Sequence, residues 1–259
     1  MDKREFMHLS KAFDQTGVLR DVSFTVKEGE FLSILGPSGC GKTTILRILI
    51  GLEKAEEGTI LKDGADITRM PSAQRNMGIV FQNYALFENM TALRNVEYAL
   101  LKSSSTKGKF ARESARKKAE EMLELVGLRD QMDKKPRQLS GGQQQRVAIA
   151  RTLALNPDVI LFDEPMSALD VDTRLSLRTE IKELQSRFGT TMIYITHDQE
   201  EAFAMSDRVM VMDNGVIHQI DTPQDIIDHP SDDYVRQFVI KNINTKIRSL
   251  ARYAREGTV

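Results

Sequence analysis

The chain has 259 residues, which is enough for one large α/β domain, or a core with a smaller lobe, that buries a substantial apolar interior. Its 36 Lys and Arg nearly balance 37 Asp and Glu, so the net charge of -1 excludes the global basic field typical of nucleic-acid-binding proteins. The single cysteine, Cys40, excludes an internal disulfide and a cysteine zinc cluster and favours a reducing, cytoplasmic environment.

The sequence lacks membrane-directing segments. Residues 1–10 are charged and have no apolar segment of the signal-peptide kind, and no run approaches the length needed to span a bilayer. We therefore expect that any work at a membrane is done from the aqueous side.

The first third of the chain reads as strands. Val22, Phe24 and Val26 alternate with polar residues, residues 27–30 form a turn, and the apolar run 31–35 predicts a buried strand that ends at a glycine. A short strand is also predicted at residues 77–81.

A helix follows the glycine-rich turn after residue 35. It is predicted to begin at Lys42 and end at Gly51 or just beyond, and its apolar positions are expected to face a core. These positions are Ile45, Leu46, Leu49 and Leu52. Asp63-Gly64 then predicts a tight hairpin between residues 59–62 and 65–68.

The apolar spacing becomes helical between about residues 91 and 155, as at Ala115, Ala119, Met122 and Val126. The polar stretch 102–109, rich in Ser and Lys, predicts a mobile surface loop. We interpret residues 91–155 as a helical subdomain inserted between the core segments 1–90 and 156–220.

The core pattern resumes after the helical stretch. Short apolar runs at 159–162 and 191–195 flank a helix that carries Leu177, Ile181, Leu184 and Phe188, as expected for parallel strands with crossover helices. A strand at 209–212, a hairpin turn at Asn214-Gly215 and two short capped helices complete the predicted domain; the caps are Thr222, with Pro223 in the first turn, and Ser231. The tail from 241 to 259 is polar and basic.

Residues 36–43 match the phosphate-loop pattern G-x-x-x-x-G-K-[ST] between a predicted strand and a predicted helix. The glycines allow backbone N–H groups to wrap phosphates, and the helix N-terminus adds positive potential. Lys42 is expected to reach the β- and γ-phosphates of ATP, and the Thr43 hydroxyl to ligate Mg²⁺. The sequence context disfavours an ordinary turn with an exposed lysine.

Two acids follow the strand 159–162. Asp163 and Glu164 emerge at the carboxyl edge of the predicted sheet, where α/β proteins bind ligands. Asp163 suits Mg²⁺, and Glu164 is placed to polarise an attacking water. Considered alone, the pair is equally consistent with solvated acids that begin a loop.

The segment Leu139 to Gln143 reads L-S-G-G-Q before a predicted helix, with Ser140 placed as its cap. A serine and two glycines at a helix N-terminus make a second anion site. With this pentapeptide the sequence resembles the ATP-binding subunits of ABC transporters. The resemblance implies an α/β P-loop NTPase fold, with a RecA-like core, an antiparallel β subdomain and an inserted α-helical subdomain, across residues 1–240.

The other parts of that family's pattern occur in the family's order: Gln82 after an apolar strand, Asp170 after the acidic pair, and His197 after the strand 191–196. The resemblance assigns catalysis to Glu164, His197 and Gln82, metal binding to Thr43, Gln82 and Asp163, and communication across a dimer to Asp170. The implied ATP-binding residues are Phe13, Gly36, Pro37, Ser38, Gly39, Cys40, Gly41, Lys42, Thr43 and Thr44. The implied signature residues, acting on the ATP of a second copy, are Ser140, Gly141, Gly142 and Gln143.

Several of these residues also have plain structural interpretations. An isolated Phe or Gln is usually a packing residue, and an isolated His before Asp198 is usually a helix-entry residue. Their joint order with three stronger motifs favours the functional interpretation. The other histidines, His8, His218 and His229, are expected to be structural or surface residues.

The resemblance implies an importer assembled from separate subunits. It implies a homodimer of ATPase chains, two transmembrane permease subunits, an extracytoplasmic solute-binding protein, no nucleic-acid partner and a peripheral location on the cytoplasmic side of the membrane. The residues in and around these motifs most resemble those of the group that handles polyamines, ferric iron, sugars and oxyanions. The apolar and aromatic segment 83–91 is expected to receive the permease coupling helices, although internal packing of the helical subdomain is an alternative for part of it.

Two features depart from that group. Phe13 replaces a tyrosine that is frequent there, and only the tail 241–259 follows, where many members continue into a β-rich regulatory domain.

A soluble ABC-type ATPase that acts on DNA or ribosomes shares the same motifs but usually has tandem domains or long coiled coils. A P-loop kinase or GTPase has no use for the pentapeptide, and a binding module without hydrolysis is disfavoured by Lys42, Asp163, Glu164 and His197.

Overall fold

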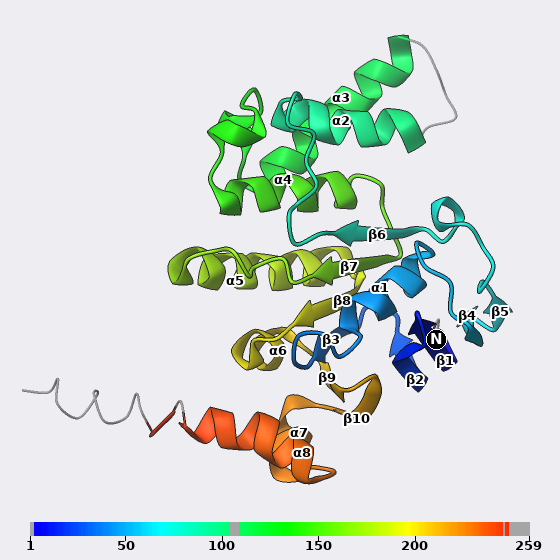
Figure 1. The fold of residues 1–259 in the computed structure, drawn as a ribbon. Coiled ribbons are helices and arrows are strands. Elements are labelled where there is room, and N and C mark those ends of the chain that lie inside the picture. Colours follow the sequence, from blue (N-terminus) through cyan, green and yellow to red (C-terminus); the bar gives the residue numbers. More distant parts are fainter. Residues whose placement is uncertain (1–2, 104–108, 246, 249–259) are drawn as a thin grey trace, which may run out of the picture. The chain divides into compact units, whose positions relative to one another are not determined.

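The computed structural model describes residues 3–103, 109–245 and 247–248 (Figure 1). It divides into two compact units. Unit 1 takes the described residues of Met1–Ile48, Glu53–Thr68 and Tyr194–Val259, and unit 2 takes those of Leu49–Leu52 and Arg69–Ile193. Among the described residues no helix is both long and apolar enough to cross a bilayer.

Unit 1 opens with an antiparallel sheet in the order β2-β1-β4-β5. The alternation predicted for the first strands is confirmed, because Val22, Phe24 and Val26 are buried and Phe6 stacks on Phe24 with ring centroids 4.5 Å apart. The predicted hairpin at Asp63 and Gly64 is confirmed too, since it joins β4 to β5. The strands are β1 (Lys3–Phe13), β2 (Thr16–Lys27), β4 (Glu57–Lys62) and β5 (Ala65–Asp66).

A second set of strands in unit 1 carries the phosphate loop. β3 (Phe31–Leu35), buried along its whole length as predicted, pairs in parallel with β9 (Arg208–Asp213), which pairs antiparallel with β10 (Val216–Asp221). The predicted turn between β9 and β10 has left-handed φ at Asn214 (45°) and Gly215 (77°), as a two-residue hairpin requires. The core beneath is formed by Leu35, Ala202, Val209, Val211, Ile226, Val235 and Val239.

Helix α1 (Lys42–Ile50) follows the phosphate loop as predicted, and Ile45, Leu46 and Leu49 are buried. The expectation for Leu52 is wrong, because this side chain is 57% exposed. Gly51, at φ 81°, ends the helix, so Leu52 lies past the last turn and leaves its apolar face.

The C-terminal part of unit 1 is helical. α6 (Gln199–Met205) follows β8, α7 (Pro223–Asp228) is capped by Thr222 as predicted, and α8 (Asp233–Val235) leads into a π-helix at Arg236–Lys241. The cap predicted for the last helix is wrong by one residue. Asp232 accepts from the backbone N–H of Val235 at 2.8 Å, whereas Ser231 donates its hydroxyl to the carbonyl of His218 at 3.0 Å.

The tail after residue 240 contains further helix at 242–245, whereas residues 246 and 249–259 lie outside the described residues.

His218 is a structural residue, as expected. Its imidazole lies 2.6 Å from a carboxylate oxygen of Asp232 and stacks on Tyr234, with ring centroids 4.4 Å apart.

Unit 2 contains two parallel strands and the helices predicted at 91–155. β6 (Met77–Val80) pairs with β7 (Val159–Asp163). α2 (Ala92–Ser103), α3 (Lys109–Leu125) and α4 (Gly141–Leu153) pack against one another, drawn in green in Figure 1. The predicted apolar positions are confirmed as buried: Ala115, Ala119, Met122 and Val126.

The loop predicted at 102–109 is shorter than expected at both ends, because Lys102 belongs to α2 and Lys109 to α3. Residues 104–108 lie outside the described residues, so their mobility stays a prediction. α5 (Val171–Phe188) ends at Gly189 in the left-handed conformation, and β8 (Thr191–Thr196) begins in unit 2 and ends in unit 1.

Candidate functional site

The phosphate loop between β3 and α1 is shaped to receive phosphate groups. Gly39 and Gly41 have φ values of 82° and 106°, a conformation that residues with a Cβ rarely adopt. A Cβ on Gly39 would meet nothing within 4 Å, so this part of the loop is open. Open backbone at the N-terminus of α1 provides both the N–H groups and the positive potential that bind polyphosphate.

The loop is supported from the β9–β10 hairpin, a feature that the sequence analysis missed. A Cβ on Gly36 would lie 2.4 Å from the carbonyl oxygen of Met212, so only glycine permits this approach. The backbone N–H of Gly215 donates to the carbonyl of Cys40 at 3.1 Å. Cys40 is buried, and burial raises the pKa of its thiol, so its side chain stays protonated at neutral pH and its backbone remains available to a phosphate.

Lys42 is folded into this loop. Its ammonium donates to the carbonyls of Gly36 and Pro37, both at 2.8 Å, and the residue is only 4% exposed. Thr43 and Thr44 follow in the first turn of α1 and are half-buried. The residues of the loop therefore fit the triphosphate of a nucleotide, with a fixed ammonium and a hydroxyl in the first helical turn.

The other predicted site residues of unit 1 are exposed. Phe13 lies at the end of β1, is 44% exposed, and carries the Lys11 ammonium 4.8 Å from its ring centroid. His197 is exposed at the point where β8 ends and α6 is about to begin. An exposed ring on a strand end can stack on a base, because stacking needs only one open face.

In unit 2 the structure joins Gln82 to the acidic strand end. The amide of Gln82 donates to the Ser167 hydroxyl at 3.1 Å, and that hydroxyl donates to the carbonyl of Glu164 at 3.1 Å. The linking position of Ser167 was not predicted from the sequence. Asp163 and Glu164 are both half-buried at the end of β7.

Glu164 has a strained backbone. Its φ is 45°, although it is not glycine and directly precedes Pro165, which normally favours extended geometry. Such a conformation costs roughly 1–3 kcal/mol and is held only where the surroundings fix it, which is typical of functional sites.

The L-S-G-G-Q segment forms a capped helix start, as predicted. The Ser140 hydroxyl accepts from the N–H of Gln143 at 3.3 Å, and the Gln143 side chain accepts from the N–H of Ser140 at 3.0 Å. A Cβ on Gly142 would lie 2.6 Å from a methyl carbon of Thr173, and one on Gly141 would lie 3.1 Å from Leu169. The glycines therefore allow α4 to approach the start of α5 closely.

Asp170 is the N-cap of α5. Its carboxylate accepts from the N–H of Thr173 at 2.9 Å and from the Thr173 hydroxyl at 2.7 Å. The backbone hydrogen bond from Thr173, followed by the bond from its hydroxyl, lowers the pKa of Asp170, so this exposed carboxylate is charged at neutral pH.

The apolar segment 83–91 is held at its first half by an arginine. Tyr84 and Ala85 both have left-handed φ values, 61° and 47°. The guanidinium of Arg151, in the last turn of α4, donates to their carbonyls at 3.0 Å and 2.8 Å. Nothing in the sequence pattern signalled this bridge, because it depends on two consecutive residues in an uncommon backbone conformation.

The second half of the segment is held by Asn95, which is fully buried on α2. Its side-chain carbonyl accepts from the N–H of Phe87 at 2.8 Å. Its amide nitrogen lies 3.2 Å from the Phe87 carbonyl, 3.3 Å from that of Met90 and 3.0 Å from that of Thr91. One side chain therefore fixes the backbone of residues 87–91.

Asn95→Ala is expected to destabilise the chain by about 2–3 kcal/mol, because it strands the N–H of Phe87 and removes donors from buried carbonyls. The midpoint of urea unfolding should fall, and hydrogen exchange of residues 87–91 should accelerate. Asn89→Ala, an exposed neighbour, serves as the control. Equal stability of the two variants would contradict the anchoring role of Asn95.

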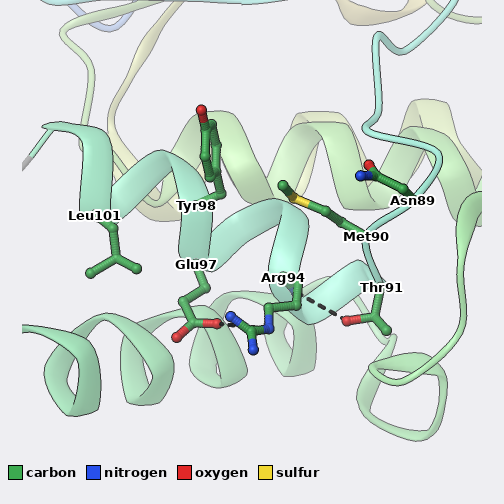
Figure 2. A pocket seen from close by; sticks show the side chains of 7 residues that line it. All are labelled: Asn89, Met90, Thr91, Arg94, Glu97, Tyr98 and Leu101. Atoms are coloured by element: carbon green, nitrogen blue, oxygen red, sulfur yellow. Dashed lines mark hydrogen bonds and ion pairs between the residues drawn. The ribbon is translucent and has the colours of Figure 1, made fainter.

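A surface groove of about 370 Å³ lies beside this segment (Figure 2). Figure 2 shows Arg94 and Glu97 side by side. The Nε atom of Arg94 lies 3.7 Å from the Oε2 atom of Glu97. Phe87, 41% exposed, packs edge-on against Tyr98 with ring centroids 5.0 Å apart. The lining residues are Asn89, Met90, Thr91, Arg94, Glu97, Tyr98 and Leu101. The segment therefore combines internal packing with an exposed apolar edge.

The geometry of β3, the glycine loop, Lys42 and α1 defines a P-loop nucleotide-binding protein. The family model described as ABC transporter matches residues 19–167. This chain belongs to the ABC transporter family, and it folds as the α/β cassette of that family's ATP-binding components.

Curated proteins similar to this chain include import ATP-binding proteins. The chain is 53% identical over 221 residues to the Fe(3+) ions import ATP-binding protein FbpC 2 of Rhizobium meliloti (strain 1021). The matched region covers 85% of this chain and 55% of that protein. It is 49% identical over 235 residues to the spermidine/putrescine import ATP-binding protein PotA of Oleidesulfovibrio alaskensis, covering 91% and 62% respectively. The chain thus spans less than two thirds of the length of these curated relatives.

Among solved structures, the chain resembles the ATP-binding cassette MJ0796 in a dimeric post-hydrolysis state bound to ADP and Pi. The two are 35% identical with a TM-score of 0.75, and the match covers 85% of this chain and 98% of that one. This likeness confirms the predicted fold class.

Proposed function

We propose that this chain is the ATP-hydrolysing subunit of an importer, in which ATP binding and hydrolysis between two copies drive solute movement through separate membrane subunits. The phosphate loop carries the proposal. The loop has open space beside Gly39, a close approach of the Met212 carbonyl to Gly36, and the buried side chain of Lys42. The names of the relatives, which are import ATP-binding proteins, support the transport role.

In the proposed reaction, the loop residues 36–44 hold the phosphates of ATP, and the Phe13 ring stacks on adenine. Lys42 neutralises the β- and γ-phosphates, and Glu164 orients and polarises the attacking water. His197 and Gln82 contact the γ-phosphate region. Mg²⁺, when bound through Thr43, Gln82 and Asp163, would neutralise charge that develops on the phosphate oxygens.

The second anion site, at the start of α4, is proposed to act on the ATP of a second copy. Ser140 and the N–H groups of Gly141 and Gly142 begin a 13-residue helix, so the helix dipole adds to their hydrogen bonds. Asp170, the N-cap of α5, would lie at the same interface and take part in communication between the two copies. Dimeric solved relatives support this arrangement. Loss of the γ-phosphate would then release the two copies.

The membrane partners are proposed to be two permease subunits, served by an extracytoplasmic solute-binding protein, with this chain on the cytoplasmic side. Phe87 and the groove lined by Tyr98 and Met90 suit the apolar face of a short permease helix. The identities to relatives named for ferric ions and for spermidine and putrescine are similar, 53% and 49%, as expected if the solute contacts other subunits of the importer.

Phe87→Glu, and likewise Leu86→Glu, is expected to uncouple transport from hydrolysis. A carboxylate in an apolar contact costs several kcal/mol, enough to prevent seating of a permease helix. Uptake of labelled ferric ion, spermidine or putrescine by cells that carry the variant should fall at least tenfold, whereas the ATPase rate of the purified chain should stay within twofold. Glu88→Gln is the control, and unchanged uptake by the Phe87 variant would contradict the docking role.

The alternative, a soluble ABC-type ATPase that acts on nucleic acid or ribosomes, receives no support from the relatives described above. The proposal is tested by the ATPase rate of the purified chain with and without DNA, RNA or ribosomes. We expect ATP hydrolysis that these additions do not stimulate. Hydrolysis that depends on nucleic acid would favour the alternative, and absence of hydrolysis would favour a binding module.

A further inference from the structure

Glu201 is a buried carboxylate four positions after the exposed His197 in the sequence. It lies in the first turn of α6 and is 4% exposed. One of its oxygens, Oε2, accepts hydrogen bonds from two hydroxyls of β8, that of Tyr194 at 2.9 Å and that of Thr196 at 2.8 Å. A buried polar group is retained only where hydrogen bonds satisfy it, and the two hydroxyls do so for this oxygen.

The same cluster forms hydrogen bonds with the residues on both sides of His197. The Thr196 hydroxyl, which donates to Glu201, accepts from the backbone N–H of Asp198 at 2.9 Å. The Asp198 carboxylate in turn caps α6 by accepting from the N–H of Glu200 at 2.8 Å. The residues on both sides of His197 are therefore fixed, and these hydrogen bonds lead through Thr196 to the Glu201 carboxylate.

We propose that Glu201 is a positioning residue for His197, which it holds, through Thr196 and Asp198, in the direction needed to contact the γ-phosphate of ATP. This inference rests on the γ-phosphate role proposed above for His197. The direction of a side chain in a turn depends on the backbone angles of its residue, and the hydrogen bonds on both sides of His197 fix these angles. A displacement of about 1 Å in a catalytic group can cost on the order of a hundredfold in rate.

The expected effect of removing this carboxylate is on turnover. Glu201→Leu should lower the kcat for ATP about tenfold while the KM changes less than twofold, because the phosphate loop is unaltered. Glu201→Gln should restore at least a third of the wild-type kcat, since one amide oxygen can accept both hydroxyls. Thr196→Val, which breaks the link to Asp198, should reproduce the effect of Glu201→Leu.

Two matched variants separate positioning from fold support. Tyr194→Phe removes the other hydroxyl but keeps the bond between Thr196 and Glu201, so its kcat should stay within twofold of wild type. Glu200→Ala changes an exposed carboxylate of the same helix and should behave likewise. Should Tyr194→Phe lower kcat as much as Thr196→Val, Glu201 would act by supporting the core, and the positioning role would be wrong.

A double-mutant cycle tests whether Glu201 acts through His197. In the His197→Ala background, Glu201→Leu should lower kcat less than twofold further. A full tenfold further loss would overturn the inference. Normal hydrolysis by His197→Ala alone would instead overturn the proposed role of His197, so the two failures are distinguishable.

Histidine NMR of the purified 259-residue chain gives a readout that needs no activity. Glu201→Leu and Thr196→Val should shift or broaden the imidazole resonance of His197. The resonances of His8, His218 and His229 should remain in place. An unshifted His197 resonance in both variants would overturn the inference.

Discussion

Glu164→Gln is expected to bind ATP with near-normal affinity and to lose about 10² to 10⁴ in turnover, the usual contribution of a positioned general base. The amide keeps the size of the side chain but cannot polarise the attacking water as a carboxylate does. Equilibrium binding of ATP and steady-state release of phosphate by the purified chain measure the two effects. If hydrolysis releases the two copies, as proposed above, the variant should also accumulate as an ATP-bound dimer.

The control for this variant is Glu121→Gln, an exposed carboxylate of α3, which should retain full activity. If Glu164→Gln hydrolysed ATP at a near-normal rate, another group would be the base. The strained φ of 45° at Glu164 would then require a different explanation.

Lys42→Ala is expected to weaken ATP binding by about tenfold to a hundredfold and to lower turnover by about 10² to 10³, comparable to the loss of one preorganised donor. The ammonium, now bonded to the carbonyls of Gly36 and Pro37 at 2.8 Å, supplies positive charge at the phosphate loop. Calorimetric titration with ATP and steady-state kinetics would measure both losses. Lys54→Ala, outside the loop, is the control, and unchanged ATP affinity in the Lys42 variant would remove Lys42 from the site.

The sequence predicted the parts of the fold that local patterns encode. The buried run 31–35, the helix after Lys42 and the hairpins at Asp63-Gly64 and Asn214-Gly215 all occur where expected. Each depends on neighbours in the chain, namely alternation, capping or a glycine with positive φ. Ser140 as a helix cap was predicted for the same reason.

The parts that sequence could not predict depend on contacts between distant segments. Arg151 binds carbonyls about 66 positions earlier in the chain, and the β9–β10 hairpin supports a loop that comes long before it. Glu201 looks like a surface helix residue until β8 places two hydroxyls against it. The burial predicted for Leu52 was wrong because the apolar spacing of the sequence continues past Gly51, whereas the helix ends there.

The roles of the site residues differ in how far the fold supports them. The loop between β3 and α1 is open at Gly39, and Gln82 is joined to the backbone of Glu164 through Ser167. The assignments of Phe13, His197 and Asp170 rest on the family resemblance, and the variants described above test His197.

The most direct test of the account is a crystal structure of Glu164→Gln with ATP and Mg²⁺. The account predicts two copies related by a two-fold axis, with the γ-phosphate held by Lys42 of one copy and the Ser140 hydroxyl of the other within hydrogen-bond distance. A structure in which nucleotide occupies the loop while Ser140 of every other copy stays far from it would contradict the account.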